Sequence, residues 1–366
     1  MEDKDYMSLA LSLAERGQGW TSPNPMVGAV LVKEGRIIGQ GWHKHRGGLH
    51  AEREALADCK TSPAGATLYV TLEPCCHYGR QPPCTDAILA AGISRVVVGA
   101  LDPNPLVAGK GIDILRAQGV SVETGVLQEE CGRLNRAFFH YVTTKRPYVT
   151  MKYAMTLDGK IATRTGASRW ITGELARERV HRDRHANAAI LAGVGTVLAD
   201  DPLLTCRLEG GKNPLRVVCD THLRTPLDSQ IVRTAGEYPT VLAVGPVDSE
   251  RAAPYEAAGC QVWTLPLREG RVDLSALMDR LGEAEIDSLL LEGGGALNWS
   301  MLEAGLVHRV QAYIAPKLFG GEAKSPVSGT GVTLPDQAFR LTDLTVTQIG
   351  EDILLEGEID HVHRNR

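Results

Sequence analysis

The sequence predicts an α/β protein of two domains, and three observations support this. The chain has 366 residues, of which 43% are hydrophobic and 23% charged, which is enough for two sizeable globular cores. Over residues 1–145, β-rich runs alternate with helical segments, a pattern typical of a three-layer α/β/α domain. From residue 146 onward, strands again precede glycine-rich turns and helices, but the motifs differ. We therefore expect domains at 1–145 and 146–366, joined near Lys145-Arg146-Pro147.

The expected elements of the first domain follow from periodicity and turn chemistry. An amphipathic run predicts the first helix, and two β-rich runs on either side of Lys33-Glu34-Gly35 predict a hairpin. Gly47-Gly48-Leu49 then leads into a helix that begins at His50. The expected helices are 6–16, 50–57, 83–89 and 127–142, and the expected strands are 27–32, 36–39, 67–72 and 95–100.

One histidine, two cysteines and a glutamate form the first candidate site. His50 stands two residues before Glu52, Cys75 follows a proline at a strand end, and Cys84 comes after eight intervening residues at a helix start. A catalytic zinc needs three protein ligands and one open position for water, which His50, Cys75 and Cys84 can provide. Glu52 is then free to move a proton from that water to a leaving nitrogen. This His-x-Glu and Pro-Cys pattern is typical of zinc-dependent deaminases.

Other interpretations of these residues stay open. Cys76 and His77 lie beside Cys75, so a closed structural site of four ligands is available, and free cysteines are also common in protein cores. Cys76 can also replace Cys75 as a ligand, although the position after proline favours Cys75. A structural site has no use for Glu52 two residues after the histidine, which favours the catalytic interpretation.

Charge and cysteine content limit the class of protein. The net charge of −5 argues against a large nucleic-acid surface, which usually shows as a basic face or tail. The acidic start, Met1-Glu2-Asp3-Lys4-Asp5, is unlike a signal peptide, and no apolar stretch is long enough to span a membrane. Without a secretory signal, the eight cysteines favour metal ligation and buried thiols over disulfides. We therefore expect a cytoplasmic protein with no nucleic-acid or membrane partner.

The second domain carries a different set of signals. A strand at 148–153, a tight turn at Asp158-Gly159 and a partner at 160–163 predict a hairpin, and 188–196 reads as a buried strand. A later strand at 288–291 leads into Glu292-Gly293-Gly294-Gly295 and a helix from 296 to about 303. Glycines between a strand and a helix let backbone N–H groups approach a phosphate. This run is therefore a candidate anion cradle.

Spacing alone leaves each residue of this second site with two interpretations. The ordinary dinucleotide fingerprint is absent, and glycine runs are also common as simple turns. Arg184 and Arg207 can clamp a phosphate bidentately or remain solvated charges. Lys152 and Asp200 flank apolar strands, where each can equally form a surface ion pair. Asn24, before the first strand of the chain, can contact a base or simply make a turn between prolines.

With both halves considered together, the chain from Tyr6 to about Gly350 resembles the bifunctional riboflavin-biosynthesis deaminase/reductase family. The resemblance rests on motifs in both halves. In the first half they are Pro23-Asn24-Pro25 with Val27-Gly28, His50-Ala51-Glu52, Thr71-Leu72-Glu73-Pro74-Cys75 with His77, Gly79 and Pro82-Pro83-Cys84, and Asp102-Pro103-Asn104-Pro105. In the second half they are Leu157-Asp158-Gly159, Trp170-Ile171-Thr172, Gly195-Thr196-Val197-Leu198-Ala199-Asp200-Asp201-Pro202, Leu204-Thr205 with Arg207, Glu292-Gly293-Gly294, and Ala315-Pro316-Lys317.

The resemblance implies a fold and two activities. It implies a cytidine-deaminase-like three-layer domain followed by a domain similar to dihydrofolate reductase, usually assembled as a homo-oligomer. The first domain would use zinc to deaminate 2,5-diamino-6-(5-phosphoribosylamino)pyrimidin-4-one, with Glu52 relaying the proton. The second would use NADPH to reduce the ribosyl group of 5-amino-6-(5-phosphoribosylamino)uracil to a ribityl chain. Such a hydride transfer needs the nicotinamide and the sugar held together.

Carried over position by position, the resemblance implies three sets of ligand-contacting residues. The NADPH site is implied at Ala154, Trp170, Thr196, Asp200, Gly294 and Gly295. The phosphoribosyl substrate is implied at Ser168, Arg184, Leu204, Arg207 and Glu292, with the arginines on its phosphate and Lys152 polarising the sugar. In the first domain, contacts to base, ribose or phosphate are implied at Asn24, His77, Arg80 and Asn104.

One departure and two other classes of protein stay open. Cys76 stands where the family pattern has serine, which leaves the identity of one zinc ligand open and makes the site more sensitive to oxidation. A nucleoside or transfer-RNA deaminase fused to an unrelated nucleotide-binding domain predicts activity on a free nucleoside or RNA. A non-catalytic zinc module predicts zinc without ammonia release. Neither class explains the motifs of the second half.

Overall fold

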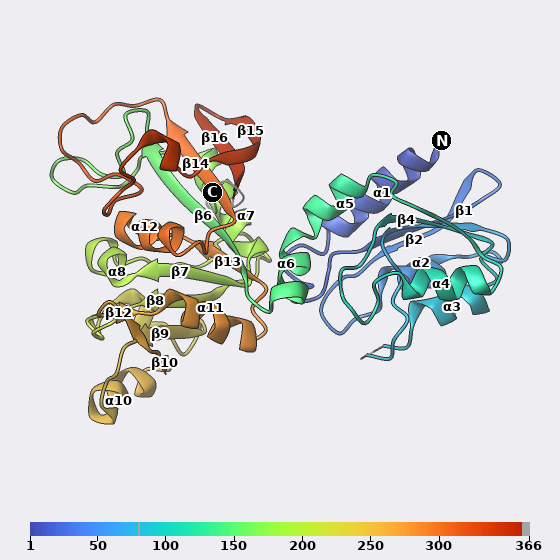
Figure 1. Cartoon of the computed structure of the whole chain (residues 1–366), viewed down its shortest axis with the longest axis horizontal. Coiled ribbons are helices and arrows are strands. Elements are labelled where there is room, and N and C mark those ends of the chain that lie inside the picture. The colour runs from blue at the N-terminus through green and yellow to red at the C-terminus, as the bar shows by residue number, and fades with distance from the viewer. Residues whose placement is uncertain (80, 361–366) are drawn as a thin grey trace. The chain divides into compact units, whose positions relative to one another are not determined.

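The computed structural model describes residues 1–79 and 81–360. Its contacts divide the chain into two compact units, an N-terminal unit at Met1–Lys145 and a C-terminal unit at Arg146–Arg366. Each unit is built on a sheet with helices packed against it (Figure 1).

A five-stranded mixed sheet forms the centre of the N-terminal unit. Its strand order is β2-β1-β3-β4-β5; β1 is antiparallel to β2 and β3, whereas β3, β4 and β5 are parallel. The strands are β1 (Gly28–Lys33), β2 (Arg36–Trp42), β3 (Thr67–Leu72), β4 (Arg95–Ala100) and β5 (Ser121–Thr124). The two residues between β1 and β2, Glu34 and Gly35, both have positive φ, as a two-residue hairpin turn of the right twist requires.

Helices cover both faces of this sheet. They are α1 (Asp3–Glu15), α2 (Ala51–Asp58), α3 (Cys84–Ala90), α4 (Lys110–Ala117), α5 (Gln128–Leu134) and α6 (Arg136–Thr144). One core contains side chains of α2, α3 and α4, and the other contains side chains of α1 and α5. Strand residues alternate between the two cores, as the two-residue period of a β-strand dictates. The predicted three-layer α/β/α architecture is confirmed.

The end of the N-terminal unit differs from the prediction. The single helix expected at 127–142 is two helices, α5 and α6, with Asn135 between them. The Asn135 amide is buried and makes two hydrogen bonds with the backbone of Met26, each 2.8 Å long. This tertiary contact replaces helical geometry at Asn135, and no local periodicity reveals it. Helix α4 and strand β5 were also not expected from the sequence.

The C-terminal unit is built on a nine-stranded sheet. Its order is β10-β9-β8-β7-β13-β6-β14-β16-β15, and neighbours are parallel from β10 to β14, whereas β14, β16 and β15 are antiparallel. The strands are β6 (Tyr148–Thr156), β7 (Ala189–Gly193), β8 (Leu215–Cys219), β9 (Thr240–Val244), β10 (Gln261–Thr264), β13 (Ser288–Leu291), β14 (Arg309–Ala315), β15 (Leu341–Ile349) and β16 (Asp352–Ile359). Strands β11 (Leu267–Arg268) and β12 (Arg271–Val272) form a separate small ribbon.

Helices again pack on both faces of the larger sheet. They are α7 (Glu174–Ala186), α8 (Val194–Asp200), α9 (Gln230–Arg233), α10 (Ser249–Ala257), α11 (Leu274–Glu283) and α12 (Gly295–Glu303), followed by a 3₁₀ turn at Pro335–Gln337. One core holds side chains of α11 and α12, and a second holds those of α8, α9 and α10. A smaller cluster packs α7 against β14 and β16. The predicted α/β class is therefore confirmed here as well.

One predicted strand of this unit is wrong, and a second is shorter than predicted. Residues 160–163 form no strand: the bond from Thr156 N to Lys160 O, 2.9 Å long, closes a turn at the end of β6, and β14 pairs with β6 as far as Thr156. The stretch from Leu157 to Ile161 bonds instead to a distant part of the chain. Leu157 N donates to Lys317 O and Ile161 N to Lys324 O, both at 2.9 Å. The strand expected at 188–196 stops at Gly193, and Gly195 and Thr196 lie in α8.

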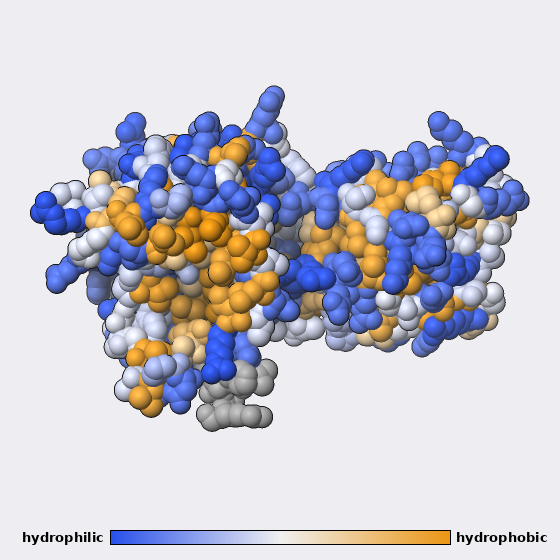
Figure 2. Space-filling model, turned by 90° about the horizontal axis from the view of Figure 1, so that it is seen from above, coloured by the Kyte–Doolittle hydropathy of each residue, from blue (hydrophilic) through white to orange (hydrophobic). Residues whose placement is uncertain are grey.

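The surface carries mixed side chains. On the face seen in Figure 2, hydrophobic side chains gather in patches among hydrophilic ones. The exposed large apolar side chains include Tyr78, Leu318 and Val346. Across residues 1–79 and 81–360, the structure contains no helix with the length and apolar character needed to cross a bilayer.

Candidate functional site

Three side chains predicted to ligate a metal lie together in the N-terminal unit. The sulfur of Cys75 is 3.5 Å from His50 Nδ1, the sulfur of Cys84 is 3.3 Å from the same nitrogen, and all three donor atoms lie within 4.8 Å of one another. Donor atoms around a tetrahedral zinc, with bonds of about 2.0–2.3 Å, are about 3.6 Å apart. One imidazole and two sulfur donors at this spacing suit a zinc ion.

Local structure explains how the three ligands meet. His50 is the residue that precedes α2, Cys75 lies three residues after the end of β3, and Cys84 is the first residue of α3. The Cys84 N–H lies 3.0 Å from Cys75 O and 3.4 Å from Cys75 Sγ. Arg53 on α2 donates to the carbonyls of Pro82 and Pro83, at 3.2 and 2.9 Å. These bonds hold the start of α3 against α2.

The electrostatics of the cluster fit metal binding and proton transfer. The hydrogen bond between the two thiol groups lowers the pKa of Cys75 to about 4 and raises that of Cys84, so in the absence of a metal one thiolate is already favoured. Glu52 is only 3% exposed. Burial, followed by the charge of Cys75, raises the pKa of Glu52. A carboxyl group whose pKa is raised in this way is suited to accept and return a proton.

The other residues considered around this cluster from the sequence are Cys76, His77, Arg80 and Asn104. Cys76 lies apart from the three ligands, with its sulfur 3.7 Å from Leu106 O. The Nδ1 atom of His77 is buried and has no hydrogen-bond partner within the described part of the chain. Arg80 lies outside the described residues. The Asn104 side-chain oxygen accepts the Leu106 N–H at 3.1 Å, so it closes a local turn.

Asn24 is oriented by a histidine that the sequence did not single out. Its Nδ2 lies 3.2 Å from His43 Nε2, and His43 Nδ1 lies 2.9 Å from Leu49 O. If His43 Nδ1 carries the proton and donates to that carbonyl, Nε2 accepts from Asn24, and the Asn24 amide is fixed next to the segment that leads into His50. Burial lowers the pKa of His43, which favours this neutral form.

In the C-terminal unit, Lys152, Arg184 and Glu292 form one ion cluster. Glu292 follows β13 and receives two hydrogen bonds from Arg184 on α7, at 2.7 and 3.0 Å, and one from Lys152 on β6, at 3.4 Å. All three side chains are 12–13% exposed. Burial alone would raise the pKa of Glu292, but the charges of Arg184 and Lys152 outweigh it and hold that pKa at about 2. Glu292 is therefore ionised at neutral pH.

Arg207 lies at the edge of this cluster with part of its guanidinium unoccupied. Its Nε donates to His181 Nε2 on α7 at 3.0 Å. Its two terminal nitrogens have no hydrogen-bond or ion-pair partner among the described residues, and the side chain is exposed. Arg184, by contrast, has a partner at each of its three nitrogens, because the third donates to Thr205 O at 3.0 Å. Of the two arginines predicted to bind phosphate, Arg207 is the one with side-chain nitrogens that have no partner among the described residues.

Asp200 bonds to one predicted residue, Ser168, and to the residue after it, Arg169. Ser168 Oγ donates to Asp200 Oδ1 at 3.0 Å, and Arg169 donates to the Asp200 carbonyl at 2.5 Å.

Thr196 lies next to the glycine run, since a Cβ added to Gly294 would be 3.6 Å from Thr196 Oγ1. Gly294 otherwise has open space, whereas a Cβ on Gly295 would be 2.4 Å from Ser328 Oγ. Gly295 thus packs against the protein, and Gly294 is the position open to a ligand.

Three further predicted residues, Ala154, Trp170 and Leu204, differ in how exposed their side chains are. Ala154 lies in β6, two residues after Lys152, and is partly buried. Trp170 is 59% exposed and stacks under the Arg177 guanidinium at 4.7 Å. The Leu204 side chain is buried in the core beneath α8, and its φ of 54° is left-handed. Only the main chain of Leu204 is therefore available to a ligand.

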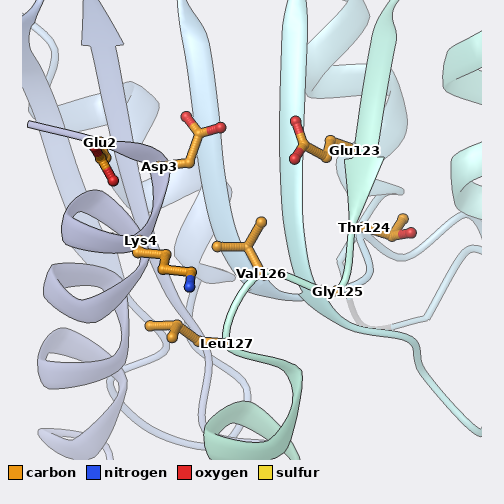
Figure 3. Close-up of a pocket in the computed structure, with 8 residues that line it drawn as sticks. All are labelled: Glu2, Asp3, Lys4, Glu123, Thr124, Gly125, Val126 and Leu127. Atoms are coloured by element: carbon orange, nitrogen blue, oxygen red, sulfur yellow. The ribbon is translucent and has the colours of Figure 1, made fainter.

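A surface pocket of about 410 Å³ lies in the N-terminal unit (Figure 3). It is lined by the start of α1 and the turn between β5 and α5, at Glu2, Asp3, Lys4, Glu123, Thr124, Gly125, Val126 and Leu127. Two of its carboxylates, Asp3 and Glu123, pair with the same Arg95 guanidinium, each at 2.6 Å. The pocket contains none of the predicted site residues, and we assign it no chemistry.

Family models match both halves of the chain. Residues 147–355 match the RibD C-terminal domain, and residues 1–100 match the cytidine and deoxycytidylate deaminase zinc-binding region. The riboflavin biosynthesis protein RibD of Actinobacillus pleuropneumoniae is 56% identical over 97% of this chain and 95% of that protein. RibD of Escherichia coli strain K12 is 40% identical over 97% of this chain and 99% of that protein.

Solved structures agree with these matches. RibD of Acinetobacter baumannii, form 1, superposes with a TM-score of 0.87 at 37% identity and covers 98% of this chain and 99% of its own. A diaminohydroxyphosphoribosylaminopyrimidine deaminase/5-amino-6-(5-phosphoribosylamino)uracil reductase of Thermotoga maritima gives 0.85 at 38% identity, with the same coverage. Because these matches span both units in a single chain, the protein belongs to the RibD family of bifunctional riboflavin-biosynthesis enzymes, with a zinc-binding deaminase domain followed by a reductase domain.

Proposed function

We propose that the two units act in sequence on one phosphoribosyl pyrimidine. The N-terminal unit deaminates 2,5-diamino-6-(5-phosphoribosylamino)pyrimidin-4-one, and the C-terminal unit reduces the ribosyl group of 5-amino-6-(5-phosphoribosylamino)uracil to ribityl with NADPH. The observation that supports this most directly is the presence, in one chain, of buried Glu52 beside the His50, Cys75 and Cys84 cluster and of the ion cluster around Glu292.

In the deaminase unit, the protein side chains hold the metal and move the proton. His50, Cys75 and Cys84 would hold a zinc ion, which would supply a polarised water when bound. Glu52 takes a proton from the attacking water and gives it to the leaving amine, so that the ring carbon exchanges nitrogen for oxygen and ammonia departs. Asn24, fixed by His43, contacts the base, and His77 is a further contact to the same substrate.

In the reductase unit, ionised Glu292 holds the two cations that face the sugar. Lys152 donates a hydrogen bond to the sugar oxygen that is unmasked when the ring opens, while Arg184 fixes Glu292 in place. Arg207 binds the substrate phosphate through its free terminal nitrogens, with Ser168 and the main chain of Leu204 nearby as further contacts. These residues orient the sugar, and orientation contributes much of the rate of a hydride transfer.

NADPH supplies the hydride when bound, and its site is proposed at the carboxyl ends of β6, β7 and β13. Gly294 at the start of α12 lets backbone N–H groups approach a phosphate, and Thr196 lies beside it. Gly295 packs against Ser328 on its Cβ side, and its backbone N–H belongs to the same proposed site. Asp200, Trp170 and Ala154 complete the proposed site.

Product analysis by mass spectrometry tests the proposal. The purified, zinc-loaded protein is incubated with the diaminopyrimidinone phosphoriboside, with and without NADPH. We expect the deaminated compound alone without NADPH and the ribityl compound with it. Activity on free nucleosides or RNA instead would favour the other deaminase class, and unchanged substrate in folded, metal-bound protein would favour a non-catalytic zinc module.

We also propose that the protein works as a homo-oligomer in the cytoplasm. Strand β15 at the edge of the nine-stranded sheet is exposed along most of its length, including Leu344 and Val346, which supports a protein contact there. Light scattering on the purified protein tests the oligomer: a mass of one chain at micromolar concentration would contradict it.

A further inference from the structure

One face of α7 holds the loop that carries Arg207. His181 and, one turn later, Arg184 and His185 bond to the loop that follows Leu204. Arg184 donates to Thr205 O at 3.0 Å, and His185 Nδ1 accepts the Lys212 N–H at 2.9 Å. His181 contacts the loop through its carbonyl, which accepts from Cys206 Sγ at 3.3 Å, and through its ring.

The ring of His181 faces Arg207 with both nitrogens. Nε2 lies 3.0 Å from Arg207 Nε, and Nδ1 lies 3.3 Å from the Arg207 backbone nitrogen. A neutral imidazole has one acceptor nitrogen, so only one of these contacts is a full hydrogen bond at a time. The shorter contact, to the guanidinium, places the ring proton on Nδ1.

The surroundings of His181 keep its ring neutral. Burial is the largest effect that lowers its pKa, and the positive charges of Arg184 and Arg207 add to it, so that the pKa is about 4. A charged imidazolium would lose its acceptor nitrogen and repel both arginines. At neutral pH, His181 is therefore a hydrogen-bond acceptor set among cations.

This contact decides which part of the guanidinium is free. With Nε bonded to His181, the edge formed by the two terminal nitrogens of Arg207 remains available, and two parallel N–H groups match two phosphate oxygens. Burial and the charges of Arg184 and Arg169 lower the pKa of Arg207, which shows that cations crowd this position before any anion binds. An acceptor on the protein side offsets part of that crowding.

We propose that His181 is a positioning residue that aims Arg207 at the phosphate of the reductase substrate. The inference rests on the proposed function of Arg207 as the phosphate contact. It predicts that replacing His181 weakens binding of the phosphorylated substrate selectively, because the guanidinium loses its orientation while Lys152 and Glu292 remain in place.

Steady-state kinetics of the reductase reaction in the full chain test the proposal. In His181→Phe, KM for 5-amino-6-(5-phosphoribosylamino)uracil should rise about tenfold, the size of one hydrogen bond to a charged group, while kcat changes little. The dephosphorylated riboside should be used equally well by His181→Phe and wild type. His181→Gln, whose amide oxygen can replace the Nε2 acceptor, should restore most of the lost affinity. Calorimetric titration without NADPH should show the same loss of binding.

Two further variants separate positioning from general support of the loop. His185→Phe removes the neighbouring contact to Lys212 and leaves the contacts between His181 and Arg207 in place, so it should not alter the preference for the phosphorylated substrate. In an Arg207→Ala background, His181→Phe should add no further loss, because the two residues act through one interaction.

The outcomes distinguish the inference from the proposed function on which it rests. If Arg207→Ala does not change KM for the phosphorylated substrate selectively, the phosphate role of Arg207 is wrong and the inference falls with it. If Arg207→Ala has that effect but His181→Phe does not, or if His185→Phe matches His181→Phe, only the positioning role is overturned. A selective loss in His181→Phe that His181→Gln repairs supports it.

Discussion

Glu52 is buried next to the three proposed metal ligands without being one of them, and a single-atom change tests its role. Glu52→Gln keeps the shape of the side chain but cannot accept a proton. We expect deamination to fall about 10³-fold, within the range that general acid–base catalysis contributes, while zinc content is unchanged. Reduction of supplied deaminated substrate should proceed at the wild-type rate. Deamination by Glu52→Gln at the wild-type rate would refute the mechanism.

Glu292 balances two largely buried cations, so its charge matters for stability as well as for the reaction. Glu292→Gln leaves Arg184 and Lys152 without a counter-charge, which should lower the free energy of unfolding of the C-terminal unit by about 3–5 kcal/mol and abolish reduction. Urea unfolding followed with an NADPH-oxidation assay measures both. Glu283→Gln is the matched control, because the Arg280 pair that it breaks is exposed and should contribute less than about 1 kcal/mol.

At the scale of elements, the sequence predicts those whose signals are local. Strands β3 and β4 begin and end at the predicted residues, because each is an apolar run bounded by turn residues. The hairpin predicted at 160–163 fails for a non-local reason: a turn signal does not reveal that β14 pairs with β6 as far as Thr156 or that Ile161 bonds to the distant Lys324. The break between α5 and α6 likewise depends on a contact between Asn135 and Met26, more than a hundred residues apart.

The same distinction applies to the two candidate sites. His50, Cys75 and Cys84 could be grouped from the sequence, because the spacing of a metal motif places its ligands on adjoining elements. No sequence motif marks the contact between His181 and Arg207. The pairing of Arg184 with Glu292, 108 residues apart, depends on the order of the strands in the sheet. The only local signal that could have drawn attention to His181 is its position three residues before Arg184.

Helix α7 gives the C-terminal unit a specific pH dependence. The pKa of His181 is about 4 in the folded chain and about 6.5 when unfolded. Between these values the unfolded chain binds a proton that the folded chain does not, so the free energy of unfolding falls as pH decreases through this window. Because the side chain is partly exposed, we expect about 1 kcal/mol after screening. Denaturant unfolding of His181→Gln should therefore show a flatter pH profile than wild type; parallel profiles would contradict this.

The start of α4 depends on one buried carboxylate. Glu73 accepts the N–H groups of Gly109 and Gly111 at 3.0 and 3.1 Å, and lies 3.4 Å from the Asp102 nitrogen. Glu73→Ala would leave these donors unpaired, and we expect the N-terminal unit to lose about 2–3 kcal/mol of unfolding free energy. Hydrogen exchange should speed up first at residues 102–111, close to Cys75. If exchange there stays at the wild-type rate, Glu73 does not organise this loop.

At the scale of the whole molecule, the two units catalyse two separate reactions. The residues proposed for deamination all belong to the N-terminal unit, and those proposed for reduction all belong to the C-terminal unit. Each unit has its own sheet and its own buried clusters, and no residue proposed for the reductase reaction is a candidate metal ligand. A treatment that acts on one set of residues should therefore leave the other chemistry in place.

Metal removal tests this independence directly. Incubation with a strong chelator should abolish ammonia release and lower the melting temperature of the N-terminal unit, because His50, Cys75 and Cys84 then lose the ion that joins α2, the end of β3 and α3. NADPH oxidation with deaminated substrate should continue unchanged, and added Zn²⁺ should restore ammonia release. Glu52→Gln serves as the comparison, since it should bind zinc normally yet stay inactive as a deaminase. If the chelator also stops NADPH oxidation, the reductase unit depends on the metal site, and the division of labour argued above is wrong.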